Sequence, residues 1–256
     1  EAYSNGVATT GPSGYVRGTT VPSGTLTSRN VYRTSEPKYP DGSNVAFVVY
    51  SSTPKKPKAE YMSQGKLHDT PTWTSFDAEQ SHMDQMIHMN FASARITHPG
   101  CRLVVLTDRE TPFDIDHITP LGKTGPPVEI FRADGLDKKE EMVSRMRARI
   151  QFLGQEKGTH DIILLDTDML VVKSMVDVFT SYDFDVAGTW RHDVQMPING
   201  GILFVKRSLV SKAVDFFQEM HDMTLLIQSR GNGVKRWFGI SDQIALAAIM
   251  TPTFGY

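Results

Sequence analysis

Residues 161–168 read Asp-Ile-Ile-Leu-Leu-Asp-Thr-Asp, and they are the strongest indication of the fold class. Its four consecutive apolar residues predict a strand that is buried on both faces, as in a parallel sheet covered by helices. Asp166 and Asp168 follow that strand directly. On an extended chain, carboxylates two residues apart face the same side, and open α/β sheets bind ligands beyond the carboxyl ends of their strands. We therefore expect both carboxylates to reach one site.

Other strands and helices are predicted on both sides of this stretch. Apolar runs at 45–50 and 103–106 predict two more buried strands, and 128–131 and 201–206 predict two shorter ones. Helix-start signals, an Asp with Gln or Glu three residues later, occur at Asp77 and Asp137, and a further helix is expected from Ser208. Strands that alternate with helices predict a single α/β domain with a Rossmann-like, mostly parallel sheet flanked by helices.

Composition sets the outer limits of the domain and excludes some partners. Residues 1–43 are rich in Gly, Ser, Thr and Pro and show no apolar period, so a linker, stem or surface arm is expected, or a tail without function. The folded domain is expected over 44–256, with continuation beyond the last residue an open alternative.

The net charge of −2 gives no reason to expect nucleic acid as a partner, and no apolar run is long enough to span a membrane. Cys101 is the single cysteine, which excludes an internal disulfide.

The tripeptide Asp166-Thr167-Asp168 predicts a divalent-cation site. Two carboxylates in an apolar setting repel each other, and Mg²⁺ or Mn²⁺ removes that cost when held by carboxylates together with substrate phosphates. The alternative without a functional role is a pair of strand-end aspartates that cap a helix or face solvent. Phosphatases of the haloacid dehalogenase type also place Asp-x-Asp after a strand, but they have Thr or Val two residues later, where this chain has Leu170.

Four segments together resemble the GT-A-type glycosyltransferases, particularly the glycogenin-like and related nucleotide-diphospho-sugar transferases. Their order and spacing agree with that family over residues 44–250. Segment 163–171 resembles the family's strand and DxD motif, 176–179 the short helix that follows, 199–205 the Asn-Ser/Thr-Gly strand entry, and 241–246 the Asp-Gln element.

The resemblance implies metal-dependent transfer of a sugar from a UDP- or GDP-sugar donor to a glycan, protein or small-molecule acceptor. Asp166 and Asp168 would hold Mn²⁺ or Mg²⁺. Asp242 and Gln243 would lie beside the reacting carbon, with Asp242 the best candidate for a base and Gln243 for a sugar contact. The residues expected to bind the donor are Val49, Tyr50, Ser51, Arg145, Arg149, Thr167, Asn199, Gly200 and Gly201.

Each proposed role has its own physical reason, and an ordinary structural role is the alternative. A metal acts as a Lewis acid on the leaving diphosphate, an arginine fork binds phosphate in a bidentate manner, and a strand-entry glycine lets the backbone approach a ligand. Arg145 and Arg149 are four residues apart on the expected helix, so they can point together into a cleft or form an ordinary surface pair. Asp242 can equally be an aspartate that the dipole at a helix N-terminus favours.

Several residues and properties stay open at this point. Trp190, His192, Asp193 and Trp237 fall in expected loops and are candidates for acceptor binding, or else packed or solvated side chains. Glycogenin-like members carry a late histidine that completes the metal site, whereas the last histidine here precedes Asp242, so the third ligand and the stereochemistry of transfer are undetermined.

Two further expectations concern the class of protein and its compartment. The alternative function is a non-catalytic, nucleotide-sugar- or carbohydrate-binding pseudo-enzyme on the same fold. A sugar-phosphate nucleotidyltransferase is disfavoured, because residues 51–54 read Ser-Ser-Thr-Pro where that class has a Gly-rich loop. A low-complexity arm before such a domain suggests a stem in the Golgi lumen, although no Asn-x-Ser/Thr glycosylation site supports it.

Overall fold

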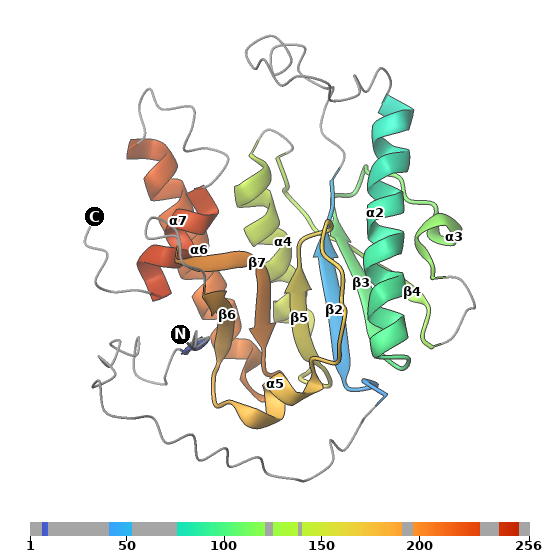
Figure 1. Ribbon diagram of the computed structural model, residues 1–256. Helices are drawn as coiled ribbons and strands as arrows, with labels where there is room; N and C mark the ends of the chain where they lie inside the picture. Colours follow the sequence, from blue (N-terminus) through green and yellow to red (C-terminus); the bar gives the residue numbers. More distant parts are fainter. Residues whose placement is uncertain are drawn as a thin grey trace, which may run out of the picture.

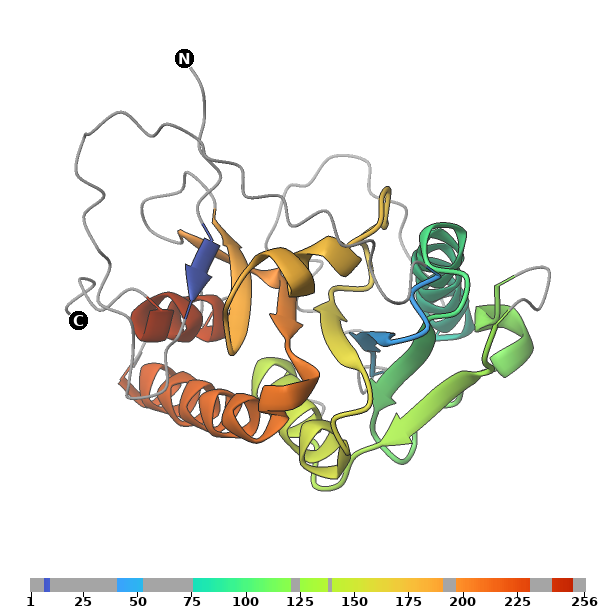
Figure 2. The same cartoon turned by 90° about the horizontal axis from the view of Figure 1, so that it is seen from below.

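The computed structural model describes residues 7–9, 41–52, 76–120, 125–137, 140–190, 197–230 and 241–250. They form a seven-stranded sheet between two layers of helices (Figures 1 and 2). The strands are β1 (Val7–Thr9), β2 (Val45–Tyr50), β3 (Arg102–Thr107), β4 (Val128–Arg132), β5 (Asp161–Leu165), β6 (Val186–Trp190) and β7 (Ile198–Val205). The helices are α2 (Phe76–Thr97), α3 (Ile115–Ile118), α4 (Glu141–Gln155), α5 (Val176–Ser181), α6 (Val210–Arg230) and α7 (Ser241–Met250), with a 3₁₀ turn, η1 (Arg207–Leu209).

Strand direction confirms the mostly parallel sheet that the sequence predicts. The strand order is β1-β6-β7-β5-β2-β3-β4. β2 pairs in parallel with β3 and β5, and β3 pairs in parallel with β4. β7 is antiparallel to both β5 and β6, so β6 runs with the parallel set and β7 against it. β1, which comes from the predicted arm, adds an antiparallel edge strand to β6.

Two apolar cores on opposite faces of the sheet explain why the central strands are continuous apolar runs. Along β2, Phe47 and Val49 pack with α2 and α5 on one face, whereas Val48 packs with α4, α6 and α7 on the other. Figure 2 shows these two helical layers edge-on. Because successive side chains of a strand alternate between faces, a strand covered on both sides must be apolar throughout.

The main differences from the predicted elements lie at helix starts and in short elements. Asp137 does not cap a helix: α4 begins at Glu141, and its N-cap residue Glu140 makes no side-chain capping bond. The Ser144 hydroxyl instead bonds the backbone N–H and C=O of Asp137, at 2.9 and 2.8 Å. Neither β6 nor α3 was predicted. The boundary proposed at residue 44 stays a prediction.

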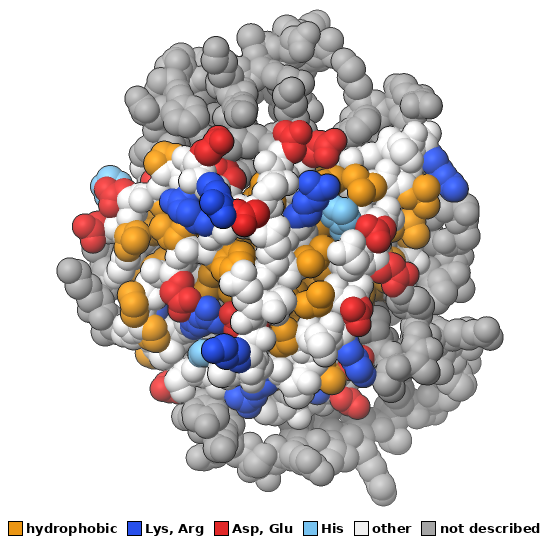
Figure 3. Space-filling view, turned by 180° about the vertical axis from the view of Figure 1, so that it is seen from behind, with side chains coloured by type: hydrophobic (Ala, Val, Ile, Leu, Met, Phe, Trp, Pro, Cys, Tyr) orange, Lys and Arg blue, Asp and Glu red, His pale blue; other side chains and the backbone are white. Residues whose placement is uncertain are grey.

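The face of the molecule opposite to the one in Figure 1 is of mixed polarity. The face seen in Figure 3 shows acidic and basic side chains interspersed with apolar ones, as is usual for a solvent-facing helix layer. None of the helices that the structure describes combines the length and the hydropathy that crossing a bilayer requires.

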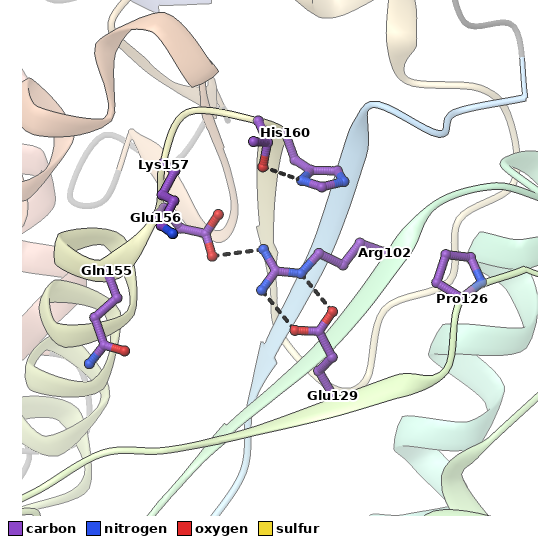
Figure 4. A pocket seen from close by; sticks show the side chains of 8 residues that line it. Arg102, Pro126, Glu129, Gln155, Glu156, Lys157 and His160 are labelled. Atoms are coloured by element: carbon purple, nitrogen blue, oxygen red, sulfur yellow. Dashed lines mark hydrogen bonds and ion pairs between the residues drawn. The ribbon is translucent and has the colours of Figure 1, made fainter.

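A cluster around Arg102 joins the last turn of α4 to the amino-terminal edge of the sheet (Figure 4). Its guanidinium makes a bidentate ion pair with Glu129, with both N–O distances 2.8 Å, and bonds Glu156 at 2.7 Å. It also lies 5.6 Å from the ring centroid of Phe152. The residues line a cavity of about 450 Å³ at the end of the sheet opposite to Asp166. The cluster therefore has a structural role.

Replacing Arg102 with methionine is expected to lower the melting temperature by roughly 4–8 °C. Losing charge-assisted bonds to two carboxylates typically costs about 2 kcal/mol, and about 1 kcal/mol corresponds to 2–4 °C in a domain of this size. Arg109→Met is the matched control, because its ion pair with Asp134 lies between side chains that are 74% and 62% exposed. Equal melting temperatures for the two variants would contradict a structural role for the cluster.

Candidate active site

The predicted site residues gather at the carboxyl edge of the central strands. Asp166 follows β5 directly, and its backbone N–H donates to the carbonyl of Gly201 on β7 at 2.8 Å. Asp242 lies in the first turn of α7. Arg145, in the second turn of α4, lies between them. This edge is the one where open α/β sheets bind ligands.

Arg145 joins two of the predicted acidic residues into one buried network. Its Nη1 donates to Asp166 Oδ1 at 2.9 Å, and its Nη2 donates to Asp242 Oδ2. Burial opposes the charge on Arg145, but the carboxylates of Asp242 and Asp166 outweigh it and raise the pKa of the guanidinium. The side chain of Asp242 is 3% exposed and that of Asp166 is 32% exposed, so the network runs from the interior to an open surface.

The Asp-Thr-Asp motif is a turn, so the extended backbone expected at this position is wrong. The N–H of Met169 donates to the carbonyl of Asp166 at 3.3 Å, which closes a tight turn over residues 166–169. Asp168 is exposed and makes no hydrogen bond or ion pair with the described part of the chain. Thr167 is half-buried. Asp166 is thus oriented by Arg145, whereas Asp168 is left open to solvent.

The strand entry of β7 orients two side-chain amides. The Oδ1 of Asn199 accepts the N–H of Gly201 at 3.0 Å, and the Oε1 of Gln243 accepts the N–H of Gly200 at 3.1 Å. Both amide groups are therefore fixed through their oxygens, and their NH₂ groups make no bond to any residue that the structure describes. Such groups can donate hydrogen bonds to the hydroxyls of a ligand.

Gly200 and Gly201 matter for the space that they leave, not for backbone conformation. A Cβ on Gly200 would lie 2.6 Å from Gln243 Nε2. A Cβ on Gly201 would lie 2.8 Å from Met169 Cε and 2.9 Å from Asp166 Oδ2. The glycine-lined backbone thus approaches side chains of the site closely, and a Cβ at either position would force those side chains to shift.

Gly201→Ala is expected to weaken metal-dependent nucleotide binding by about tenfold or more, because the methyl group displaces the carboxylate of Asp166. Isothermal titration of UDP and GDP in the presence of Mn²⁺ measures the effect. Gly154→Ala is the matched control: it lies in α4 with nothing within 4 Å of a new Cβ, so it should raise stability by about 0.5–1 kcal/mol and leave binding unchanged. Unchanged binding by Gly201→Ala would remove Asp166 from the nucleotide site.

Three polar residues, two on α2 and one directly after it, support the loop that carries the motif, and none of them was predicted from the sequence. Asn90 Nδ2 donates to the carbonyls of Asp166 and Met169, at 3.2 and 3.0 Å. Ser93 Oγ accepts the N–H of Val171 at 2.9 Å, and His98 Nε2 accepts the N–H of Met175 at 2.9 Å. The available signal was Asn90 itself, since asparagine disfavours helix interiors yet lies here among core apolar residues.

The end of β2 lies on the other side of the motif. Val49 is fully buried in the core, and Ser51 is buried with its N–H bonded to the carbonyl of Leu106 at 3.0 Å. The hydroxyl of Tyr50 donates to Ser52 Oγ at 3.1 Å. Burial raises the pKa of Tyr50 to about 12, and its bond to Ser52 partly offsets that rise, so the phenol is neutral at physiological pH.

The acceptor candidates are only partly placed. Trp190 ends β6 and is 47% exposed, so its side chain is not packed in the core. His192, Asp193 and Trp237 lie outside the described residues. His221, the last histidine, is on α6 and bonds Arg147 and Asp222, at 3.2 and 2.9 Å, which occupies both of its ring nitrogens.

The donor set fits a divalent cation that is shared with a ligand. Asp166 and Asp168 are the two carboxylates at the edge, and among the residues with a described position no three acidic, histidine or cysteine side chains converge as ligands. Mg²⁺ and Mn²⁺ are commonly held by one or two carboxylates and completed by phosphate oxygens and water. The residues present therefore fit a cation that is completed by a diphosphate.

Comparison with solved structures identifies the fold. The domain aligns with the galactosyltransferase LgtC, solved in complex with donor and acceptor sugar analogs, at a TM-score of 0.51 and 12% identity over 81% of this chain and 71% of that chain. The glycosyltransferase GlyE of Streptococcus pneumoniae aligns more loosely, at a TM-score of 0.45 and 14% identity. That alignment covers 80% of this chain, which spans only 43% of the GlyE chain.

The likeness to LgtC establishes a GT-A-type fold, in agreement with the sequence resemblance. An identity of 12% does not by itself carry the activity of LgtC over to this chain. No protein-family model matches the sequence, and no curated protein does.

Proposed function

We propose that this domain is a divalent-metal-dependent glycosyltransferase that takes its sugar from a UDP- or GDP-linked donor. The observation that supports it most is the network in which Arg145 joins Asp166, at the end of β5, to Asp242, at the start of α7. It supports the proposal because the expected cation ligand Asp166, an arginine suited to binding phosphate and a buried carboxylate lie together at the carboxyl edge of a GT-A-type sheet.

Each group of residues has a distinct role in the proposal. Asp166 and Asp168 hold Mn²⁺ or Mg²⁺, which, when bound, supplies a Lewis acid for the leaving diphosphate. Arg145, a rigid fork of donors, binds phosphate oxygens in the same region. Asn199 and Gln243, whose oxygens are fixed by the backbone of β7, present NH₂ groups to the sugar hydroxyls. Asp242 places a fixed negative charge beside the reacting carbon.

The proposal predicts nucleotide binding that requires metal. UDP or GDP is expected to raise the melting temperature of the wild type in the presence of Mn²⁺, by an amount that grows with ligand concentration, and to have no effect in Asp168→Ala. Asp168 is exposed and makes no hydrogen bond or ion pair with the residues that the structure describes, so its replacement is expected to leave the fold intact and the unliganded melting temperature unchanged. A wild type that melts cooperatively but responds to neither nucleotide would overturn the donor site.

Turnover separates the enzyme from a binding protein on the same fold. Release of free nucleotide from a UDP- or GDP-sugar in the presence of Mn²⁺ is expected of the enzyme alone. Metal-dependent binding without any release would favour the non-catalytic alternative.

A further inference from the structure

Arg149 is the largest fully buried side chain in the described part of the protein, with 2% exposure. It lies one helical turn after Arg145 on α4. Its guanidinium lies 5.8 Å from the ring centroid of Phe217, and no hydrogen bond or ion pair joins it to any residue within the described ranges. An arginine has five N–H donors, so this burial leaves an unusual number of them without a partner.

Keeping such a side chain is costly for the fold. Burial and, to a lesser extent, the positive charge of Arg145 lower the pKa of Arg149 to about 9, yet the group is still charged at neutral pH. A buried charge without a counter-charge is destabilising, and an apolar side chain of similar volume would serve the core better. The position therefore calls for an explanation outside core packing.

The matching unpaired group is an oxygen of Asp242. Arg145 bonds Oδ2, whereas Oδ1 of Asp242 is buried and makes no hydrogen bond. Asp242 is also among the negative charges that act favourably on Arg149, so the two lie in the same electrostatic neighbourhood. The site thus contains a buried donor and a buried acceptor of opposite charge, neither of which has a hydrogen-bond partner in the ligand-free protein.

We propose that Arg149 is a positioning residue. When the donor binds, it forms a hydrogen bond to Asp242 in place of the one that Arg145 makes in the ligand-free protein. A cation at Asp166 competes for the oxygen that Arg145 now holds, and the donor diphosphate attracts the fork of Arg145. Asp242 would then be a buried carboxylate without a partner. A hydrogen bond from Arg149 to Oδ1 would then hold Asp242 in place while Arg145 binds the phosphate. This inference rests on the proposed function.

Binding of UDP and of GDP, each with Mn²⁺, to four proteins tests the proposal by isothermal titration. The proteins are the wild type, Arg149→Met, Asp242→Asn and the double variant. Arg149→Met is expected to weaken nucleotide binding about tenfold, the typical effect of losing a hydrogen bond to a charged group. In the Asp242→Asn background the same change is expected to have no effect, because the partner of Arg149 is already neutral.

Two controls separate positioning from packing. Arg149→Lys keeps the charge and should restore most of the affinity. Arg147→Met, on the same helix but bonded to His221 and to the carbonyl of Gly135, should leave binding unchanged. Equal losses from Arg149→Met in both backgrounds, or no loss in either, would overturn the proposal.

The melting temperatures of the same four proteins without ligand keep the two hypotheses distinguishable. If the wild type binds no nucleotide, the proposed function fails. The pairing of Arg149 with Asp242 is then judged by the ligand-free proteins alone. Asp242→Asn should lower the melting temperature by several degrees more in the wild type than in Arg149→Met, because only the wild type retains Arg149, a second buried cation that the charge of Asp242 stabilises. Additive changes would overturn the pairing.

Discussion

Asp166→Asn is expected to lower the turnover of a UDP- or GDP-sugar by on the order of a thousandfold. The carboxylate is both a proposed ligand of the cation and the partner of Arg145 Nη1. Losing a preorganised charge that acts on a leaving group typically costs a hundredfold to a thousandfold, and loss of the cation adds to that. Release of nucleotide under saturating Mn²⁺ measures the change.

This variant distinguishes an effect on turnover from an effect on the stability of the fold. Asparagine retains an oxygen that can accept the bond from Arg145, and the backbone bonds to Gly201 and Asn90 do not involve the side chain. The melting temperature should therefore change little. Asp177→Asn is the matched control, since it is an exposed aspartate on α5, just beyond the same loop. Turnover by Asp166→Asn within tenfold of the wild type would show that the motif does not hold the catalytic cation.

The layered fold could be predicted because a strand that is covered on both faces is apolar throughout, and this pattern is visible within the sequence of each strand. β2 and β5 have the bounds expected from the sequence, and β3 extends one residue beyond the expected run at each end. Helices cover both faces of these strands, so each apolar run ends where the strand leaves the helical layers. β6 escaped prediction because its sequence, Val-Ala-Gly-Thr-Trp, is short, contains a small residue and ends in an exposed tryptophan.

The site was predictable in its motifs but not in its supporting contacts. Asp166 and Asp242 stand out because carboxylates rarely follow buried strands or begin buried helices without a reason. The contact between Asn90 and the backbone of Asp166 spans 76 residues, and it is defined by the packing of α2 and not by any local pattern. The turn at 166–169 was missed because residue spacing alone cannot distinguish an extended pair of carboxylates from a turn.

Arg145→Met is expected to lower the melting temperature by roughly 6 °C or more, in addition to impairing turnover. Removing one member of a buried ion pair typically costs about 3–5 kcal/mol, because the other member is left uncompensated, and about 1 kcal/mol corresponds to 2–4 °C. Here the member left behind is Asp242, whose side chain is 3% exposed and whose second oxygen is already unbonded. Thermal unfolding of the two proteins at neutral pH measures the loss.

Arg149→Met, the same substitution one turn along α4, provides the comparison that tests this reasoning. Arg145 is a paired cation and Arg149 is not, so removing the first leaves a buried anion and removing the second relieves a buried cation. The melting temperature should therefore fall in Arg145→Met and hold or rise in Arg149→Met, although both changes remove the same atoms from neighbouring turns. Equal losses would mean that both arginines act through packing. Opposite signs would mean that the protein keeps Arg149 at the expense of stability, as expected of a group retained for function.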